Sequence, residues 1–380
     1  MRRSILLVIA LCAQSYFTGH AQTSVPASTV PVKRIAGIEV GSKGVKLSVL
    51  ERSLSNGNDF KLLKDSAINS DFISFTSSSY DATLNALTGL YNYSKDQWNI
   101  SPGDIATLVS SGVKAQADKL GKNAYIQTLI DAFKIKINEE NRVVDIVSVK
   151  RESVLSHYGI IPDAERYTTF LIDIGSGNTK GGYFSLDSKD FVMFQIPSGT
   201  KSATNLTEKN CGSACDFLSY KSYVDAVIDT IEKNEIVYAV NASGAYPASS
   251  TMAISGGIAW AVATLLYPER TNDQQIDVTY KDVNRFREGL IKYYADIPDT
   301  NKLFIRGMSS EKLSNIRMEL QKVINVFDIK SLLAGCSLML RIMRQFEAVN
   351  SSKKFTLIKN GQVGWITGYI LDKDKRDLSR

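Results

Sequence analysis

The sequence predicts an α/β protein made of two duplicated domains that face a central cleft. Strand-like runs alternate with segments of helical spacing along the chain, as is typical of an α/β fold. A strand, a glycine-rich turn and a second strand occur together twice, at residues 34–53 and 168–186. The chain has 380 residues, of which 44% are hydrophobic and 22% are charged, so it is long enough for about two to three globular domains.

The two hairpins match each other position by position. Four pairs of identical or similar residues lie at one common offset of 134 residues: Glu39 and Asp173, Gly41 and Gly175, Ser42 and Ser176, and Lys46 and Lys180. Chance agreement in glycine- and serine-rich sequence is the alternative. We interpret the repeat as two related domains, at residues 34–160 and 161–380.

The other elements follow in order along both halves. After the first hairpin come a helix, a strand with a helix-prone segment, a second helix, and a strand leading into a helix, at residues 81–98, 105–121, 123–137 and 143–159. After the second hairpin comes a strand, glycine and helix segment at residues 251–266, and then an apolar helix at 331–347. We expect this last helix to bury its apolar face, with Cys336, in a second domain that closes with a helix and a strand.

The N-terminus has the pattern of a secretory signal peptide. Arg2 and Arg3 precede an apolar run at residues 4–13, which is shorter than the roughly 20 residues that cross a bilayer. We expect a signal peptide at residues 1–21, an extended leader at residues 22–33, and a periplasmic or secreted protein with no membrane span after cleavage. Removing the two arginines lowers the formal charge from +6 to +4, which favours anionic partners only weakly.

The hairpin turns indicate phosphate binding. A P-loop and a dinucleotide-binding loop both run from their glycines into a helix, whereas the segment after Gly177 alternates as a strand. A hairpin turn can point its backbone N–H groups at one anion, and glycines such as Gly175 carry no side chain that would block it. Asp173 places a carboxylate where a hydrated Mg2+ could sit beside that phosphate. Gly256 and Gly257, between a strand and a helix, add a third anion-binding element, and plain hairpins without a ligand are the alternative.

Taken in order, these segments resemble the actin-like ATPase superfamily, with its ribonuclease H-like domains, and within it the exopolyphosphatase and guanosine pentaphosphate phosphohydrolase family. "GIEVGSKGVKLSVLE" and "LIDIGSGNTKGGYF" are similar to that family's two phosphate segments. Further similar segments are "TLVSSGVKAQADK", "VDIVSVKRESVLSHYG", "QIPSGTKSAT", "AISGGIAWAVA" and the C-terminal stretch from "SLLAGC" to "WITGYI". The resemblance covers nearly all of the chain after the leader.

The resemblance implies a phosphohydrolase that releases the terminal phosphate from polyphosphate or a related phosphoanhydride with Mg2+. By position, it makes Glu152 the base that aligns and deprotonates water, and Glu39 and Asp173 the acids that hold metal. The phosphate-binding residues that it implies are Gly41, Ser42, Lys43, Gly175, Ser176, Gly177, Asn178, Thr179, Lys180, Gly256 and Gly257. The expected partner is polyphosphate or a phosphorylated nucleotide, and a homodimer is an open option.

Several positions depart from the family pattern. Glu39 stands where aspartate is usual, and Lys43 and Gly44 replace a polar pair. Lys180 stands where a glutamate usually helps to hold metal, and a charged lysine cannot ligate Mg2+. Arg151 stands where a second acid is more frequent. A second function is therefore open, a phosphate-, nucleotide- or protein-binding module without chemistry, and a sugar kinase ranks below both because no sugar-site aspartate can be named.

The remaining features have simpler interpretations. Cys211 and Cys215, with three residues between them, either close a small disulfide or remain two loop thiols. The alternative for Glu152, which follows two cations, is a solvated helix residue. His157 has no evident partner and is expected on a helix surface or in packing. Aromatic residues do not accompany basic runs, so no nucleic-acid partner is expected.

Overall fold

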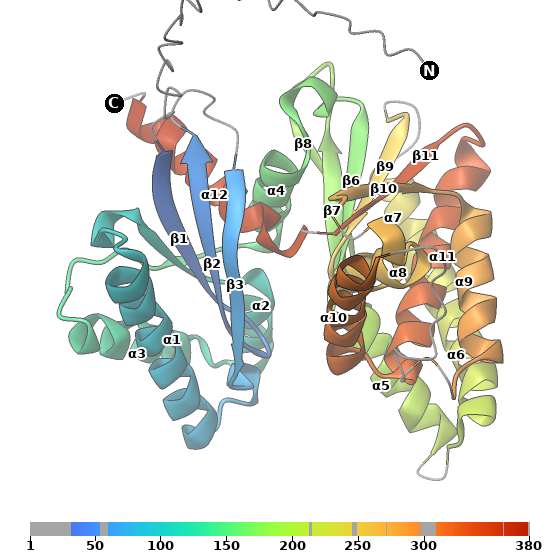
Figure 1. The fold of residues 1–380 in the computed structure, drawn as a ribbon, viewed down its shortest axis with the longest axis horizontal. Coiled ribbons are helices and arrows are strands. Elements are labelled where there is room, and N and C mark those ends of the chain that lie inside the picture. The colour runs from blue at the N-terminus through green and yellow to red at the C-terminus, as the bar shows by residue number, and fades with distance from the viewer. Residues whose placement is uncertain are drawn as a thin grey trace, which may run out of the picture.

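The computed structural model describes residues 32–53, 60–212, 215–244, 249–270, 272–295, 297, 309–359 and 361–378. The predicted signal peptide and most of the predicted leader lie outside these ranges. Two α/β lobes lie side by side, and each contains one sheet (Figure 1). The predicted fold class of two duplicated α/β domains is confirmed.

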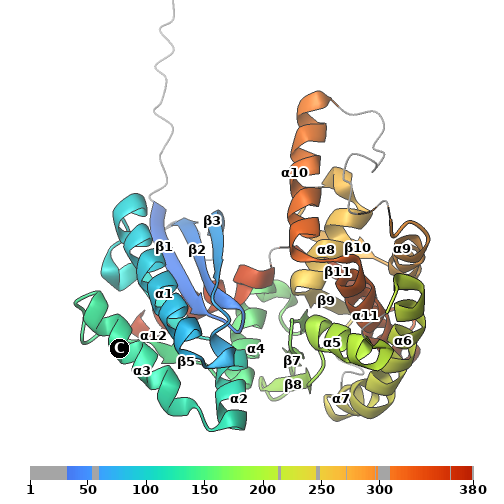
Figure 2. The same cartoon turned by 90° about the horizontal axis from the view of Figure 1, so that it is seen from below.

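The first lobe is formed by the N-terminal part of the chain and by the last helix, which returns to it (Figure 1). Its strands are β1 (Val32–Val40), β2 (Gly44–Ser53), β3 (Phe60–Asn69), β4 (Ile105–Val109) and β5 (Asp145–Ile146). Its helices are α1 (Ser77–Trp98), α2 (Ser111–Leu120), α3 (Asn123–Lys136) and α12 (Gly364–Leu378). A further helix, α4 (Val149–Ile160), lies between the two sheets in both views (Figure 1 and Figure 2).

The second lobe contains the middle and most of the C-terminal part of the chain. Its strands are β6 (Thr169–Ile174), β7 (Thr179–Phe184), β8 (Phe191–Ile196), β9 (Thr251–Ser255), β10 (Gln275–Val278) and β11 (Lys354–Ile358). Its helices are α5 (Thr200–Cys211), α6 (Phe217–Ile231), α7 (Val237–Ala242), α8 (Gly257–Leu266), α9 (Tyr280–Lys292), α10 (Ser310–Val326) and α11 (Ile329–Val349). A π-helical turn, Glu232–Ile236, joins α6 to α7.

The two sheets share one topology. The first has the strand order β3-β2-β1-β4-β5, and the second has the order β10-β11-β9-β6-β7-β8. In the first sheet β1 pairs antiparallel with β2 and parallel with β4, and in the second β6 pairs in the same two ways with β7 and β9. The second sheet adds β10 as an antiparallel edge strand. The repeat expected from the two hairpins therefore extends across the sheets.

Helices cover both faces of the first sheet. On one face, α1 and α3 pack against apolar side chains of β1 and β2 such as Ile38 and Leu47. On the other face, Trp365 and Ile366 of α12 pack against the same two strands. Because neither face is open to water, residues 35–40 of β1 are buried without interruption.

The α11 helix forms the centre of the second lobe. It is buried along most of its length and packs against α5, α6 and α9, as its apolar composition predicted. Cys336 is fully buried there, and burial raises the pKa of its thiol to about 12. Within the described ranges, no single helix has the length and apolar content to cross a membrane; α10 and α11, which meet at 91°, satisfy both criteria only when taken together.

The α4 and α12 helices cross in direct backbone contact. A Cβ atom at Gly159 would lie 1.8 Å from the carbonyl oxygen of Gly364, and one at Gly368 would lie 1.9 Å from that of Leu155. Larger residues cannot occupy this crossing without moving the helices apart. The C-terminal helix therefore fixes the position of α4 on the first lobe.

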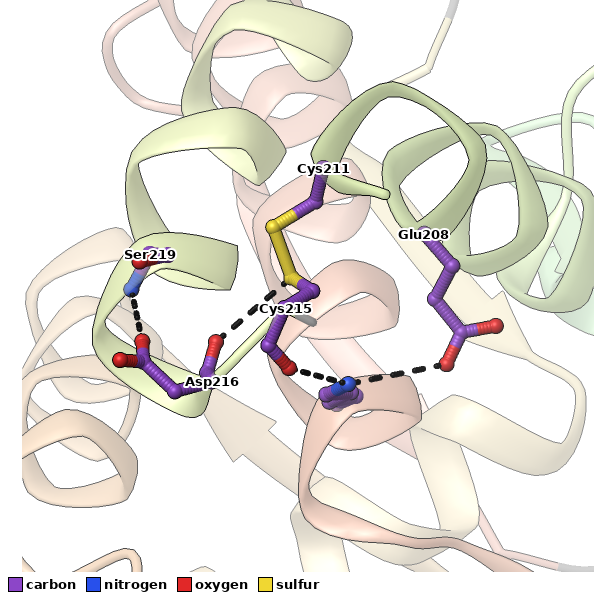
Figure 3. The surroundings of a disulfide bond; sticks show 6 residues. Glu208, Cys211, Cys215, Asp216 and Ser219 are labelled. Carbon is purple, nitrogen blue, oxygen red and sulfur yellow. Dashed lines mark hydrogen bonds and ion pairs between the residues drawn. A yellow bond between two sulfur atoms is a disulfide. The ribbon is translucent and has the colours of Figure 1, made fainter. Parts of the chain in front are cut away.

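A disulfide joins the end of α5 to the loop before α6. Of the two alternatives that the sequence left open, a small disulfide or two loop thiols, the structure has the disulfide. Cys211 and Cys215 are four positions apart, with their Cα atoms separated by 5.4 Å (Figure 3). Lys330 at the start of α11 donates to the carbonyl oxygen of Cys215 (3.2 Å) and lies 4.0 Å from Glu208 of α5. The bridge and these contacts connect three helices at this end of the second lobe.

Candidate functional site

The first glycine turn connects β1 to β2. The Gly41 N–H donates to the carbonyl oxygen of Gly44 (2.8 Å), which closes the turn. The N–H groups of Ser42 and Lys43 have no protein acceptor in the described part of the chain. The turn lies against the start of α2, since a Cβ atom at Gly112 would be 3.0 Å from Ser42 Oγ. Two backbone donors of this turn are therefore available to a ligand.

The second glycine turn connects β6 to β7 and is hydrogen-bonded to the start of α5. The N–H groups of Thr200 and Lys201, at the start of α5, donate to the carbonyl oxygens of Gly175 (2.9 Å) and Ser176 (2.7 Å). Over the ranges that the structure describes, the N–H groups of residues 176–178 find no protein acceptor. The carbonyl groups of the turn thus accept hydrogen bonds from α5, and its N–H groups are available to a ligand.

The Thr179 side chain stabilises the segment that supports this turn. Its hydroxyl donates to the carbonyl oxygen of Ser198 (2.8 Å) and is buried. Glu235, on the π-helical turn, accepts hydrogen bonds from the N–H (3.2 Å) and the hydroxyl (2.9 Å) of Ser198. The Thr179 hydroxyl therefore stabilises the segment that supports the turn, which is a different role from the predicted contact with phosphate.

The acids predicted to hold metal occupy equivalent positions in the two hairpins, and each has a lysine opposite it. Glu39 lies opposite Lys46 in the β1–β2 ladder, with 3.8 Å between Lys46 Nζ and Glu39 Oε2. Asp173 lies opposite Lys180 in the β6–β7 ladder. The matched sequence positions are thus matched in space.

Glu152 is buried, so its interpretation as a solvated helix residue is wrong. It lies in the first turn of α4 and is 5% exposed. Its Oε1 atom accepts from Lys180 Nζ (2.5 Å), and its Oε2 atom accepts from the N–H of Ser111 at the start of α2 (2.8 Å). The neighbouring Arg151 turns away and pairs with Asp372 of α12. Glu152 consequently connects a first-lobe helix to a second-lobe strand.

These charged groups share one electrostatic environment. Burial raises the pKa of Glu39 and the pKa of Asp173, the charge of Glu152 adds to both shifts, and the charges of Lys46 and Lys180 oppose them. Burial alone would also raise the pKa of Glu152, but the Lys180 ammonium and the hydrogen bonds to Lys180 and Ser111 outweigh it and hold this pKa below its usual value. Glu39 and Asp173 therefore belong to one site.

Two further lysines approach from opposite lobes. Burial lowers the pKa of Lys43 on the first turn, and the nearby charges of Lys201 and Lys46 lower it further. Lys201 belongs to α5, whose backbone binds the second turn. An anion bound near both ammonium groups would offset the repulsion between their charges.

The third glycine element contacts Asp173 directly. Gly256 has a φ of +97°, and a Cβ atom there would lie 2.3 Å from the carbonyl oxygen of Ile174 and 2.8 Å from Asp173 Oδ1. The hydroxyl of Ser255 donates to the same Asp173 oxygen (3.3 Å). Since α8 begins at Gly257, its N-terminus points its partial positive charge towards this end of β6.

His157, on the same helix as Glu152, packs behind the site. It is fully buried, its Nε2 atom contacts the carbonyl oxygen of Thr169 (3.1 Å), and its ring meets Phe184 and Phe191 edge to face. Burial lowers its pKa to about 4. The expectation of a packing histidine is confirmed.

Three contacts of the acids were not anticipated from the sequence. Ser111 lies just beyond the end of β4, and Ser255 is the last residue of β9. The rule that the ends of parallel strands line the ligand site in α/β folds could have identified both. Trp365 donates from its Nε1 atom to Glu39 Oε2 (3.3 Å) across 326 positions. No local pattern indicates that contact, because it depends on the return of α12 to the first lobe.

Comparisons with known proteins identify the fold. No protein-family model matches the sequence, and no curated protein matches it either. Among solved structures, a Ppx/GppA family member from Aquifex aeolicus superposes with a TM-score of 0.62 at 14% identity, over 91% of this chain and 99% of that chain. An exopolyphosphatase from Cytophaga hutchinsonii superposes with a TM-score of 0.54 at 15% identity, over 90% and 98% of the two chains. The resemblance stated from the sequence is confirmed at the level of the fold.

Proposed function

We propose that this chain, which has the fold of the Ppx/GppA proteins, is a phosphohydrolase that releases the terminal phosphate from polyphosphate or a related phosphoanhydride. The observation that carries the proposal is the pair of glycine turns with available N–H groups. The positive charges of Lys43, on the first turn, and of Lys201, whose backbone binds the second turn, also repel each other. A phosphate bound there would accept from the turns and relieve the repulsion between the two ammonium groups.

Glu152 supplies the base in this proposal. Its lowered pKa keeps it ionised at neutral pH, and each of its oxygens retains a second acceptor position beside its present hydrogen bond. Phosphoryl transfer needs placement and charge stabilisation more than a covalent nucleophile. Glu152 would therefore orient a water molecule towards the terminal phosphorus and accept its proton.

The substrate follows from the proposed location. A signal peptide at residues 1–21 would bring the reaction to the periplasm or outside the cell, where ATP is scarce, so we name polyphosphate before a nucleotide. The Mg2+ that the resemblance implies does not fit the donor set well, because Lys46 and Lys180 stand beside the acids that would hold it. No step proposed here depends on that ion.

The test is release of inorganic phosphate by the purified protein from polyphosphate, guanosine pentaphosphate and ATP. Glu152→Gln should reduce the rate by roughly a hundred- to ten-thousand-fold, because it removes the proton acceptor. Glu51→Gln is the matched control, since Glu51 lies at the far end of β2 and pairs with Arg34. An unchanged rate in Glu152→Gln would exclude it as the base.

Titration calorimetry with the same compounds addresses the alternative of a binding module. If these compounds give heat of binding but no phosphate is released in any buffer, the protein binds them on the same turns without hydrolysing them.

A further inference from the structure

Both hairpins place an ammonium group where a metal ion would have to approach. Lys46 faces Glu39 in the first ladder, and Lys180 faces Asp173 in the second. The two lysines occupy the same register relative to the acid, at positions related by the internal repeat; Lys46 lies 3.8 Å from Glu39, whereas the Lys180 ammonium binds Glu152. One lysine beside one acid could be incidental, but the repeated arrangement points to a shared use.

The carboxylates of the site also have other donors. Each accepts one hydrogen bond from a neutral N–H or O–H group: Glu39 from Trp365 Nε1 (3.3 Å), Asp173 from Ser255 Oγ (3.3 Å), and Glu152 from Ser111 N (2.8 Å). Mg2+ requires near-octahedral oxygen ligands at about 2.0–2.1 Å and is repelled by neighbouring cations. Among the residues that the structure describes, no group of three or more His, Cys, Asp or Glu side chains is arranged to hold a metal ion.

We propose that Lys46 and Lys180 take the place of the divalent cation, so that the site binds a condensed phosphate directly, without metal. This inference rests on the proposed function and specifies how its substrate is held. An ammonium group has three N–H donors, so Lys180 can keep its bond to Glu152 and donate to a phosphoryl oxygen. Lys46 is half-exposed and can reach the same ligand from the first lobe.

The experiment is titration calorimetry of the purified protein with tripolyphosphate in EDTA and in MgCl2, with phosphate release measured in both buffers. Because Mg2+ complexes tripolyphosphate in solution, a lysine site should bind at least as tightly in EDTA as in MgCl2. A site that uses Mg2+ should show the opposite order. Binding that appears only with MgCl2 would overturn the inference.

Two variants at one position sharpen the result. Lys180→Met should weaken binding in EDTA by roughly ten- to a hundredfold, because it removes a charged donor. Lys180→Glu should weaken tripolyphosphate binding similarly. This variant should also show a rise in melting temperature with MgCl2, because it adds a fourth carboxylate to Glu39, Asp173 and Glu152. If Lys180→Met binds as tightly as the unaltered protein in EDTA, the lysine is not a ligand-binding group.

The outcomes separate the two proposals. Binding in EDTA without phosphate release would exclude the proposed hydrolase activity and support the metal-free binding site. Phosphate release only in MgCl2 would leave the hydrolase and remove the metal-free site. Absence of both binding and release in both buffers would remove both.

Discussion

Replacing Lys180 with methionine should destabilise the protein in a pH-dependent manner. Methionine keeps much of the side-chain length but removes the ammonium group that binds Glu152. Lys180 and Glu152 are only 7% and 5% exposed, so the remaining carboxylate cannot recover its hydration and takes up a proton instead. Removing one partner of a buried ion pair typically costs about 3–5 kcal/mol.

The cost of that proton sets the magnitude. A carboxyl group with the ordinary pKa of 4.5 must bind a proton at pH 7, which costs about 3.4 kcal/mol at 1.36 kcal/mol per pH unit. The same step costs about 2 kcal/mol at pH 6 and about 0.7 kcal/mol at pH 5. In the variant, the pKa of Glu152 is higher in the folded state than in the unfolded state. The cost is therefore present at high pH and is relieved as the pH falls.

Urea unfolding at pH 5, 6 and 7 measures this loss, with tryptophan fluorescence and circular dichroism as probes whose transitions must coincide. The control is the double variant Lys180→Met, Glu152→Gln, in which the amide oxygen can still accept from the Ser111 N–H. It should recover most of the stability and lose the pH dependence. Equal losses at pH 5 and pH 7, or a double variant no more stable than Lys180→Met, would refute the argument.

Three other perturbations change the free energy of unfolding through a buried histidine, a disulfide and a helix crossing. The pKa of His157 falls from 6.5 to about 4 on folding, so acid protonates this residue in the unfolded chain first. When the pH falls from 6.5 to 4, the free energy of unfolding of His157→Leu, measured in urea, should therefore drop by about 3 kcal/mol less than that of the wild type. Parallel pH dependences of the two proteins would contradict this. Replacing Cys211 and Cys215 with serine should lower the free energy of unfolding by about 2 kcal/mol, and a reductant should shift the urea midpoint of the wild type alone. Gly159→Ala should lower the free energy of unfolding, measured in urea, by about 1–3 kcal/mol or more, because its Cβ atom would lie 1.8 Å from a backbone oxygen of α12. Gly89→Ala in α1 has open space and should stabilise by about 0.5–1 kcal/mol, so equal effects at the two glycines would exclude a tight crossing.

The repeat was the most informative feature of the sequence. The alignment of Glu39 with Asp173 and of Lys46 with Lys180 predicted two related hairpins, and both ladders have the corresponding register. Short-range patterns of this kind are readable because register, turn and strand lie within a few residues of each other. The fold class followed from the repeat together with the alternation of strands and helices.

The tertiary contacts of the acids were less accessible to prediction. Glu152 stands beside Lys150 and Arg151, a pattern that equally fits a solvated helix face, and only packing shows that Glu152 alone turns inward. The second domain was expected to close with the apolar helix at residues 331–347, which is α11, followed by a strand. The structure has the strand β11 and, beyond it, the helix α12, whose Trp365 reaches the other end of the chain. Such contacts depend on the path of the whole chain.

The positions of the site residues imply a link between ligand binding and the arrangement of the lobes. The α4 helix packs against both lobes, through its crossing with α12 and through His157 against the second sheet, and the Glu152 carboxylate accepts from Ser111 of the first lobe. The same carboxylate accepts from Lys180 of β7 in the second lobe (2.5 Å), so Glu152 links the two lobes through its hydrogen bonds to Ser111 and Lys180.

A phosphate held between Lys43 and Lys201 would act across the same boundary. Both interactions therefore favour the same arrangement of the lobes, and by reciprocity each should strengthen the other. Lys180→Met should accordingly weaken tripolyphosphate binding by more than the loss of one donor to the ligand. Protection of the wild type against urea by tripolyphosphate should fall by a corresponding factor in that variant.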